Sequence, residues 1–273
     1  MLVGSAKGVN RIAHTELKAA LYDIKKSAPD SLHEDQAKAI LAKHGITSDD
    51  AFEYLKTIIP FDSDAKRPFY TKLVIMSSRA IHEILKPLIN SRPKPCQIFY
   101  EESYSDKLFT EDHSSTLFLL IEEQLNPTKL KNFYYSLASN FPSSGIVVGY
   151  FSPGHFTLTA PFISEVGNPC VFCKLSRLQH YEDQKTGQSA WTRLLSFANK
   201  HHTAVFGESP TPLQTHLACL LANEQVLKYT TAQGVRLQDN NMLSSSINLT
   251  SGHVVEESTS HWCLCDCLGM PSC

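Results

Sequence analysis

The sequence lacks the features that mark several large classes of protein. It contains no uninterrupted run of 18 apolar residues, and its first twenty residues have no apolar core followed by a cleavage site, as a secretory signal would. The formal net charge is only −2, and 19% of the 273 residues are charged. This balance indicates neither nucleic acid nor an anionic membrane as a partner. We therefore expect a soluble, cytoplasmic protein.

Common catalytic and nucleotide-binding motifs are missing as well. Neither GxGxxG nor GxxxxGK[ST] occurs in the chain, and GxSxG and HExxH are also absent. Where a nucleotide-binding fold places glycines after its first strand, this chain has Ser77-Ser78-Arg79. Backbone N–H groups approach phosphate most closely at a glycine-rich turn, so we expect that ATP binding has been lost and that the chain holds no catalytic residue.

The first 68 residues predict a small helical module. Apolar residues with helical spacing indicate a first helix around 17–24, a second after the capping box Ser31–Glu34 that stops at Gly45, and a third capped at Thr47 or Ser48 and closed by Pro60. Three short helices with tight joints are typical of a winged-helix-like module. The polar, turn-rich segment 62–68 then indicates a domain boundary.

A DNA-binding role for this module is one alternative, but the charges oppose it. The third helix would enter the groove, and its first turns carry Asp49, Asp50 and Glu53. These carboxylates would face phosphates, whereas they suit the positive end of a helix dipole. The pattern therefore favours a solvated helix face.

From residue 69 to 273 the pattern changes to alternating strands and helices. Apolar runs predict buried strands at 73–76 and 116–121, and further strands are expected at 97–100, 146–150 and 156–160. Helices are expected around 81–89, from Asn126-Pro127 onward, and at 188–198 and 212–229. Residues 239–260 read as a loop with one strand-like piece at 252–257. The alternation predicts an α/β fold, a degenerate Rossmann-like domain with a mostly parallel sheet covered on both faces.

Clustered cysteines give the strongest signal for a site. Cys170 and Cys173 form a CxxC pair, and the tail carries Cys263, Cys265 and Cys267 some 90 residues later. In a reducing compartment such groups indicate a metal rather than disulfides. Cys170, Cys173, Cys265 and Cys267 predict a closed structural zinc site with four cysteine ligands, and Cys263 is a substitute ligand. His261 could ligate the metal, but a histidine at such a position more often packs or donates a hydrogen bond to a ligand.

One combination of residues resembles a known family. Gly167-x-Pro169-Cys170-x-Phe172-Cys173 is followed by Ser189-x-Trp191, by Gly207-Glu208-Ser209, and finally by His261-Trp262-x-x-Cys265-x-Cys267. In this order and at these separations, they resemble the McbB-type subunit of microcin synthetases, the bacterial complexes that make thiazoles and oxazoles from Cys, Ser and Thr of a precursor peptide. Residues 160–267 carry the resemblance.

The resemblance implies a degenerate relative of the ubiquitin-activating, ThiF/MoeB-like fold, with structural zinc on the same four cysteines. It implies a non-catalytic scaffold that recognises the leader of a ribosomal precursor peptide in antibiotic biosynthesis, the leader adding a β-strand to the N-terminal module. The implied partners are a second copy of the chain, a YcaO-type cyclodehydratase that uses ATP, and an FMN-dependent dehydrogenase.

The N-terminus departs from the family's pattern. The family's recognition element begins with β-strands, whereas only about 13 residues precede the first helix here. Either these strands are short, or the edge that binds the leader is built from residues around 66–71. Two other functions remain as alternatives: an ATP-dependent adenylating enzyme of the ThiF class, and a zinc-stapled, winged-helix DNA-binding regulator.

Overall fold

The structure, a computed structural model, divides into two compact units, residues 1–66 and 67–273. The residues whose structure is described are 2–5, 8–12, 14–27, 34–58, 69–90, 97–101, 104, 113, 115–184, 190–205, 209–231 and 242–269. No helix among them is long and apolar enough to cross a membrane.

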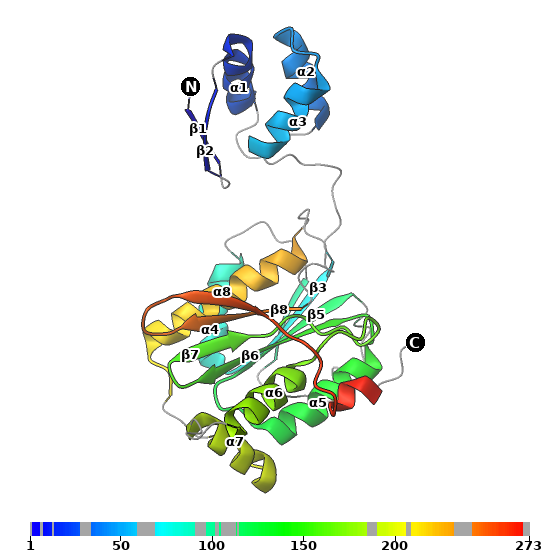
Figure 1. The fold of residues 1–273 in the computed structure, drawn as a ribbon, viewed down its shortest axis with the longest axis vertical. Coiled ribbons are helices and arrows are strands. Elements are labelled where there is room, and N and C mark those ends of the chain that lie inside the picture. Colours follow the sequence, from blue (N-terminus) through cyan, green and yellow to red (C-terminus); the bar gives the residue numbers. More distant parts are fainter. Residues whose placement is uncertain are drawn as a thin grey trace. The chain divides into compact units, whose positions relative to one another are not determined.

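Unit 1 consists of a β-hairpin and three helices. β1 (Leu2–Ser5) pairs antiparallel with β2 (Gly8–Arg11), and α1 (Thr15–Ser27), α2 (Glu34–Lys43) and α3 (Asp49–Ile58) follow (Figure 1). The three helices were predicted. Of the two possibilities for the N-terminus, the structure has the short strands, which end only four residues before α1.

The helices of unit 1 enclose a small core of their own. Asp23 of α1 accepts from Lys43 Nζ at 3.2 Å and lies 2.9 Å from His44 Nε2, so it ties α1 to the end of α2. Gly45, with φ +74°, ends α2 as predicted, and Ser48 Oγ accepts from Asp50 N at the start of α3. The predicted capping box at Ser31–Glu34 and the stop at Pro60 fall mostly outside the described residues. The buried core residues are Ile12, Leu17, Ala20, Leu21, Ile24, Ala37, Leu41, Phe52 and Leu55.

Unit 2 is built on one seven-stranded sheet with the order β4-β3-β5-β6-β7-β8-β9. β3 (Lys72–Met76), β4 (Gln97–Glu101), β5 (Thr116–Glu122) and β6 (Gly145–Ser152) are parallel. β7 (His155–Leu158), β8 (Leu243–Asn248) and β9 (Val254–Ser258) continue it antiparallel. The α/β class is confirmed, while the expectation of a mostly parallel sheet is corrected to a mixed one.

β8 is a strand that the sequence did not predict, because residues 239–260 indicated a loop with one strand-like piece. Its serines find partners across the sheet instead of an apolar core: Ser244 Oγ lies 2.8 Å from Thr259 Oγ1, and Ser246 Oγ lies 3.2 Å from Thr157 Oγ1. Pairing on both sides, with β7 and β9, thus makes a strand of a polar segment.

Helices cover both faces of the sheet, as expected (Figure 1). α4 (Arg79–Asn90) and α8 (Pro212–Thr230) pack on one face, against the side chains of Leu73, Leu119 and Val147. α5 (Pro127–Asn140), α6 (Val171–Asp183) and α7 (Ala190–His201) pack on the other, against Val74, Phe118 and Val148. Alternate residues of each strand face opposite helix layers, which explains the continuous apolar runs in the sequence. As predicted, Asn126 caps α5 by accepting from Lys129 N, and Pro127 begins that helix.

Candidate functional site

The CxxC half of the cysteine cluster is placed by a turn and a helix start. Gly167 adopts φ +68°, and the buried Asn168 accepts from Ile163 N at 2.8 Å and donates to Pro161 O at 2.9 Å. Cys170 follows as the N-cap of α6, and Cys173 lies in the first turn of that helix. The helical spacing therefore turns both thiols toward the same side.

The tail supplies the other half. A turn in which Cys265 N donates to Trp262 O at 3.0 Å leads into a short 3-10 helix (Asp266–Gly269) that carries Cys267. Asp266 pairs with Lys131 Nζ of α5 at 2.5 Å. These contacts place the tail against α5 and α6. Cys265 thus lies near Cys173, although some 90 residues separate them in the chain.

The four predicted thiols lie together and are buried. The Sγ atoms of Cys170 and Cys265 are 3.4 Å apart, those of Cys173 and Cys267 are 3.5 Å apart, and those of Cys170 and Cys173 are 3.9 Å apart. All four lie within 4.8 Å of one another. A tetrahedral zinc with Zn–S bonds of about 2.3 Å has sulfur–sulfur edges of about 3.8 Å, so the spacing fits such an ion. Cys263 is exposed and lies outside this cluster.

The packing of the thiols perturbs their acidity. The pKa of Cys170 is raised because its thiol hydrogen-bonds to Cys173, and that same bond lowers the pKa of Cys173. The pKa of Cys265 is lowered to about 6, first by its hydrogen bond with Cys170.

Two further side chains reach these sulfur atoms. Tyr135 Oη of α5 lies 3.5 Å from Cys265 Sγ and 3.7 Å from Cys170 Sγ. His261 Nδ1 lies 3.9 Å from both Cys173 Sγ and Cys267 Sγ. The sequence pointed to His261 as a hydrogen-bonding residue but gave no sign of Tyr135, which stands beside the fully buried Tyr134.

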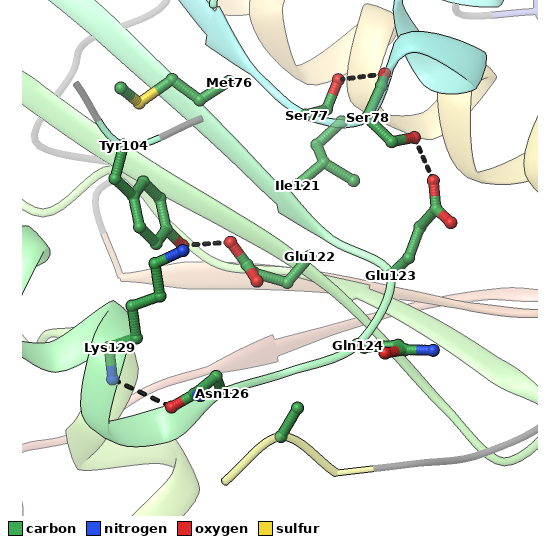
Figure 2. A pocket seen from close by; sticks show the side chains of 11 residues that line it. Met76, Ser77, Ser78, Tyr104, Ile121, Glu122, Glu123, Gln124, Asn126 and Lys129 are labelled. Carbon is green, nitrogen blue, oxygen red and sulfur yellow. Dashed lines mark hydrogen bonds between the residues drawn. The ribbon is translucent and has the colours of Figure 1, made fainter. Parts of the chain in front are cut away.

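A second feature is a crevice of about 440 Å³ at the carboxyl ends of β3 and β5 (Figure 2). The chain leaves β3 toward β4 on one side, while β5 lies on the other side of β3, so this is the switch point at which open α/β sheets bind ligands. The residues that line it are Met76, Ser77, Ser78, Tyr104, Ile121, Glu122, Glu123, Gln124, Asn126, Lys129 and Ala204.

Within the described part of this crevice, polar groups bind one another. Figure 2 shows the Tyr104 hydroxyl directed at the Glu122 carboxylate, to which it donates a hydrogen bond, and the Ser78 hydroxyl donating to Glu123. Burial raises the pKa of Glu122, although the bond from Tyr104 and the charge of Lys129 act against this. Lys129 Nζ lies 5.2 Å from the centre of the Tyr104 ring, in cation–π geometry.

The start of α4 is where a bound phosphate would be expected in such a fold. Ser78 precedes the helix, and its carbonyl accepts from His82 N at 3.1 Å. Glu123, bound to the Ser78 hydroxyl, brings the chain's own carboxylate to this helix N-terminus. A phosphate entering here would meet that negative charge, and it would find serines in place of the glycines that permit close approach.

Comparison with known proteins adds to this picture. Residues 1–269 match the family described as Microcin B17-processing protein McbB. One curated relative is the Microcin B17-processing protein McbB of Escherichia coli, 26% identical over 161 residues, which are 56% of this chain and 53% of the relative. The matched part thus spans about half the length of that relative.

Solved structures share the fold at low sequence identity. A chain of the E. coli Microcin synthetase McbBCD complex with pro-MccB17 bound has a TM-score of 0.62 at 20% identity, over 98% of this chain and 94% of that chain. The structure of E. coli MccB with ATP gives a TM-score of 0.54 at 11% identity, over 97% and 93%. The fold therefore occurs in a subunit of a synthetase complex and in a protein solved with ATP.

Proposed function

Because this chain belongs to the McbB family, we propose that it is a non-catalytic scaffold and leader-peptide-recognition subunit of a thiazole/oxazole synthetase. It works beside a YcaO-type cyclodehydratase, an FMN-dependent dehydrogenase and a second copy of itself, on Cys, Ser and Thr of a ribosomal precursor peptide in microcin-like biosynthesis. ATP and FMN belong to the partner subunits. The observation that carries the proposal is the family match over nearly the whole chain.

The β-hairpin of unit 1 supports leader recognition in residues 1–68, as a winged-helix-like module. Its sheet has two strands only, so β1 and β2 each have one edge unpaired with another described strand. An extended peptide can add to such an edge through main-chain hydrogen bonds, and neighbouring side-chain pockets then fix its register. Strands of four residues provide a short edge, which suits a leader held by a few residues at a time.

The strand-end crevice supports a role without catalysis. A ThiF-class enzyme needs an anion-binding turn at the start of α4, and here Glu123 occupies that neighbourhood while Ser77 and Ser78 replace glycine. We therefore expect the purified chain to consume no ATP, alone or with precursor peptide. Formation of AMP or ADP by the isolated chain would favour the alternative, an adenylating enzyme.

The four-cysteine cluster is proposed as a structural zinc site. Four thiolates complete a tetrahedral shell and leave no position for substrate or water, so zinc would supply cross-linking and no chemistry. Cys170, Cys173, Cys265 and Cys267 are the ligands, and they join the tail to the first turn of α6.

The proposal is tested by purifying the tagged chain from its own host and identifying what accompanies it. We expect a yellow complex that contains a YcaO-like protein and a flavoprotein by mass spectrometry, and zinc by metal analysis. The co-purified precursor then serves as the probe: the intact chain should bind a fluorescent copy of its leader, and a chain lacking residues 1–68 should not.

Two controls make the test decisive. The shortened chain keeps every residue of the two core clusters of unit 2, so its thermal unfolding must be compared with that of the intact protein. The intact chain with Cys263→Ser, a change at an exposed thiol, should bind as the wild type does. Equal leader affinity of the shortened and intact chains would refute recognition by the N-terminal module.

A further inference from the structure

Tyr135 and His261 each contact a different pair of the four sulfur atoms. Tyr135 reaches Cys170 and Cys265, whereas His261 reaches Cys173 and Cys267. Each side chain therefore contacts one thiol of the CxxC half and one thiol of the tail. Between them, every sulfur atom of the cluster has one polar neighbour of this kind.

The direction of these contacts would be fixed by a bound metal ion. Thiols release their protons to solvent when they bind zinc, so each sulfur atom would only accept and the Tyr135 hydroxyl would donate. His261 donates in the tautomer that carries the proton on Nδ1. A Zn²⁺ ion with four thiolates keeps a net charge of −2, and hydrogen bonds to the sulfur atoms draw off part of that charge in a buried place.

The Tyr135 ring is held so that its hydroxyl points at the cluster. It lies 5.5 Å, centre to centre, from the ring of Phe172, which stands between the two CxxC cysteines, and 5.7 Å from Tyr134. Lys131, four residues earlier on the same face of α5, binds Asp266 of the tail. One face of α5 thus contacts both the CxxC turn and the tail.

We propose that Tyr135 and His261 are positioning residues of the metal centre, each bridging one thiolate of the CxxC turn and one of the tail so that metal loss and detachment of the tail are slowed. This inference rests on the proposed metal centre and concerns residues outside its ligand set. Tyr135 carries the shorter contacts and is the stronger of the two donors.

The test uses the full-length chain with Tyr135→Phe, which keeps the ring and its packing and removes only the hydroxyl. Tyr181→Phe is the matched control, because Tyr181 is an exposed tyrosine of α6. Each protein is loaded with Co²⁺, whose absorption reports both tetrahedral geometry and charge transfer from sulfur. Zinc release to a chromogenic chelator is then measured for the zinc-loaded proteins.

Loss of the donor makes the sulfur atoms richer in electrons. We expect the sulfur-to-cobalt band of Tyr135→Phe to move to longer wavelength while the tetrahedral d–d bands persist, and zinc release to become about 10-fold faster. Tyr181→Phe should match the wild type. His261→Ala should also speed release, His261→Asn should restore part of the effect by keeping an N–H donor, and the double change with Tyr135→Phe should exceed either single change.

The possible outcomes distinguish the positioning role of Tyr135 from the metal centre on which it depends. An unchanged sulfur-to-cobalt band and release rate in Tyr135→Phe, with the tetrahedral site intact, would overturn the positioning role and leave the metal centre standing. A wild-type chain that gives no cobalt–thiolate band would overturn both.

Discussion

Replacing Cys265 by serine tests how much the metal centre contributes to unit 2. Part of the tail is held without the cysteines: Trp262 packs against the core, with its ring 4.9 Å from that of His180, and Arg177 donates to Ser260. The residues around Cys265 are held less firmly, because Leu264 is 80% exposed, Leu268 is 52% exposed, and the Lys131–Asp266 pair lies at the surface. Exposed ion pairs of this kind contribute about 0–1 kcal/mol. Cys265 and Cys267, by contrast, are buried within the core layer formed by α5, α6 and α7. A serine hydroxyl is a poor ligand for zinc, so the variant loses the ion or binds it weakly.

The expected loss of stability follows from the loop that the proposed zinc would close. It joins positions some 90 residues apart, and closing a loop of roughly 100 residues contributes about 4.7 kcal/mol in the chain-entropy model for disulfides. We therefore expect Cys265→Ser to lower the free energy of unfolding by about 3–5 kcal/mol, a large part of the about 5–15 kcal/mol of an ordinary domain. For a unit of this size the melting temperature should fall by about 10 °C, and part of the protein should precipitate.

Thermal unfolding followed by circular dichroism, with zinc content measured on the same samples, provides the assay. Cys263→Ser is the matched control, because that thiol is exposed and stands two residues before Cys265. The double variant Cys263→Ser/Cys265→Ser excludes substitution of one ligand by the other. The reasoning is refuted if the double variant retains one zinc per chain, or if it melts within about 2 °C of the wild type.

Two other substitutions test the crevice and the sheet. Burial raises the pKa of Glu122, so the protonated carboxyl group stabilises the fold. This stabilisation is present below the ordinary pKa of a glutamate and is lost as the pH rises through the raised pKa. Glu122→Gln should therefore raise the melting temperature by a few degrees at pH 8, and this gain should vanish toward pH 4; an equal gain at both values would contradict the assignment. In β6, a Cβ at Gly149 would lie 2.6 Å from Phe156 Cζ, so Gly149→Ala should lower the free energy of unfolding by about 1–3 kcal/mol in urea titrations. Gly269→Ala, which meets no atom within 4 Å, is the control, and equal midpoints for the two variants would be evidence against the overpacking.

The elements that the sequence predicted best have their determinants within a few neighbouring residues. β5 is a run of apolar residues buried on both faces, and α5 begins with a capping asparagine and a proline, a local signal that needs no knowledge of the fold. The cysteine cluster was predictable for a related reason. The spacing of each half is local, and four thiols in two such groups are a typical ligand set for zinc, which predicted that the halves meet.

The features that escaped prediction depend on partners far away in the chain. β8 is a strand because β7 and β9 pair with it on both sides, and its serines contact Thr157 and Thr259 there; the segment itself gives no sign of this. Tyr134 and Tyr135 are neighbours on a helix, yet only Tyr135 reaches the sulfur atoms within hydrogen-bonding distance, a difference set by where the tail crosses α5. Glu122 and Glu123 accept hydrogen bonds from Tyr104 and Ser78, which belong to other segments of the chain, so their roles could not be predicted locally.

Helix α5 connects the crevice and the cysteine cluster. Lys129 lies over Tyr104 at the crevice, and Tyr135 lies at the cysteine cluster, six residues or about 9 Å farther along the helix axis. At the crevice, Ser78 is bound to Glu123 and Tyr104 to Glu122, and at the cluster all four thiols face one another. At both places the described polar groups contact other parts of the chain. Lys129 lies in the first turn of α5 and Tyr135 lies near its middle, so this one helix makes contacts at both the crevice and the cysteine cluster.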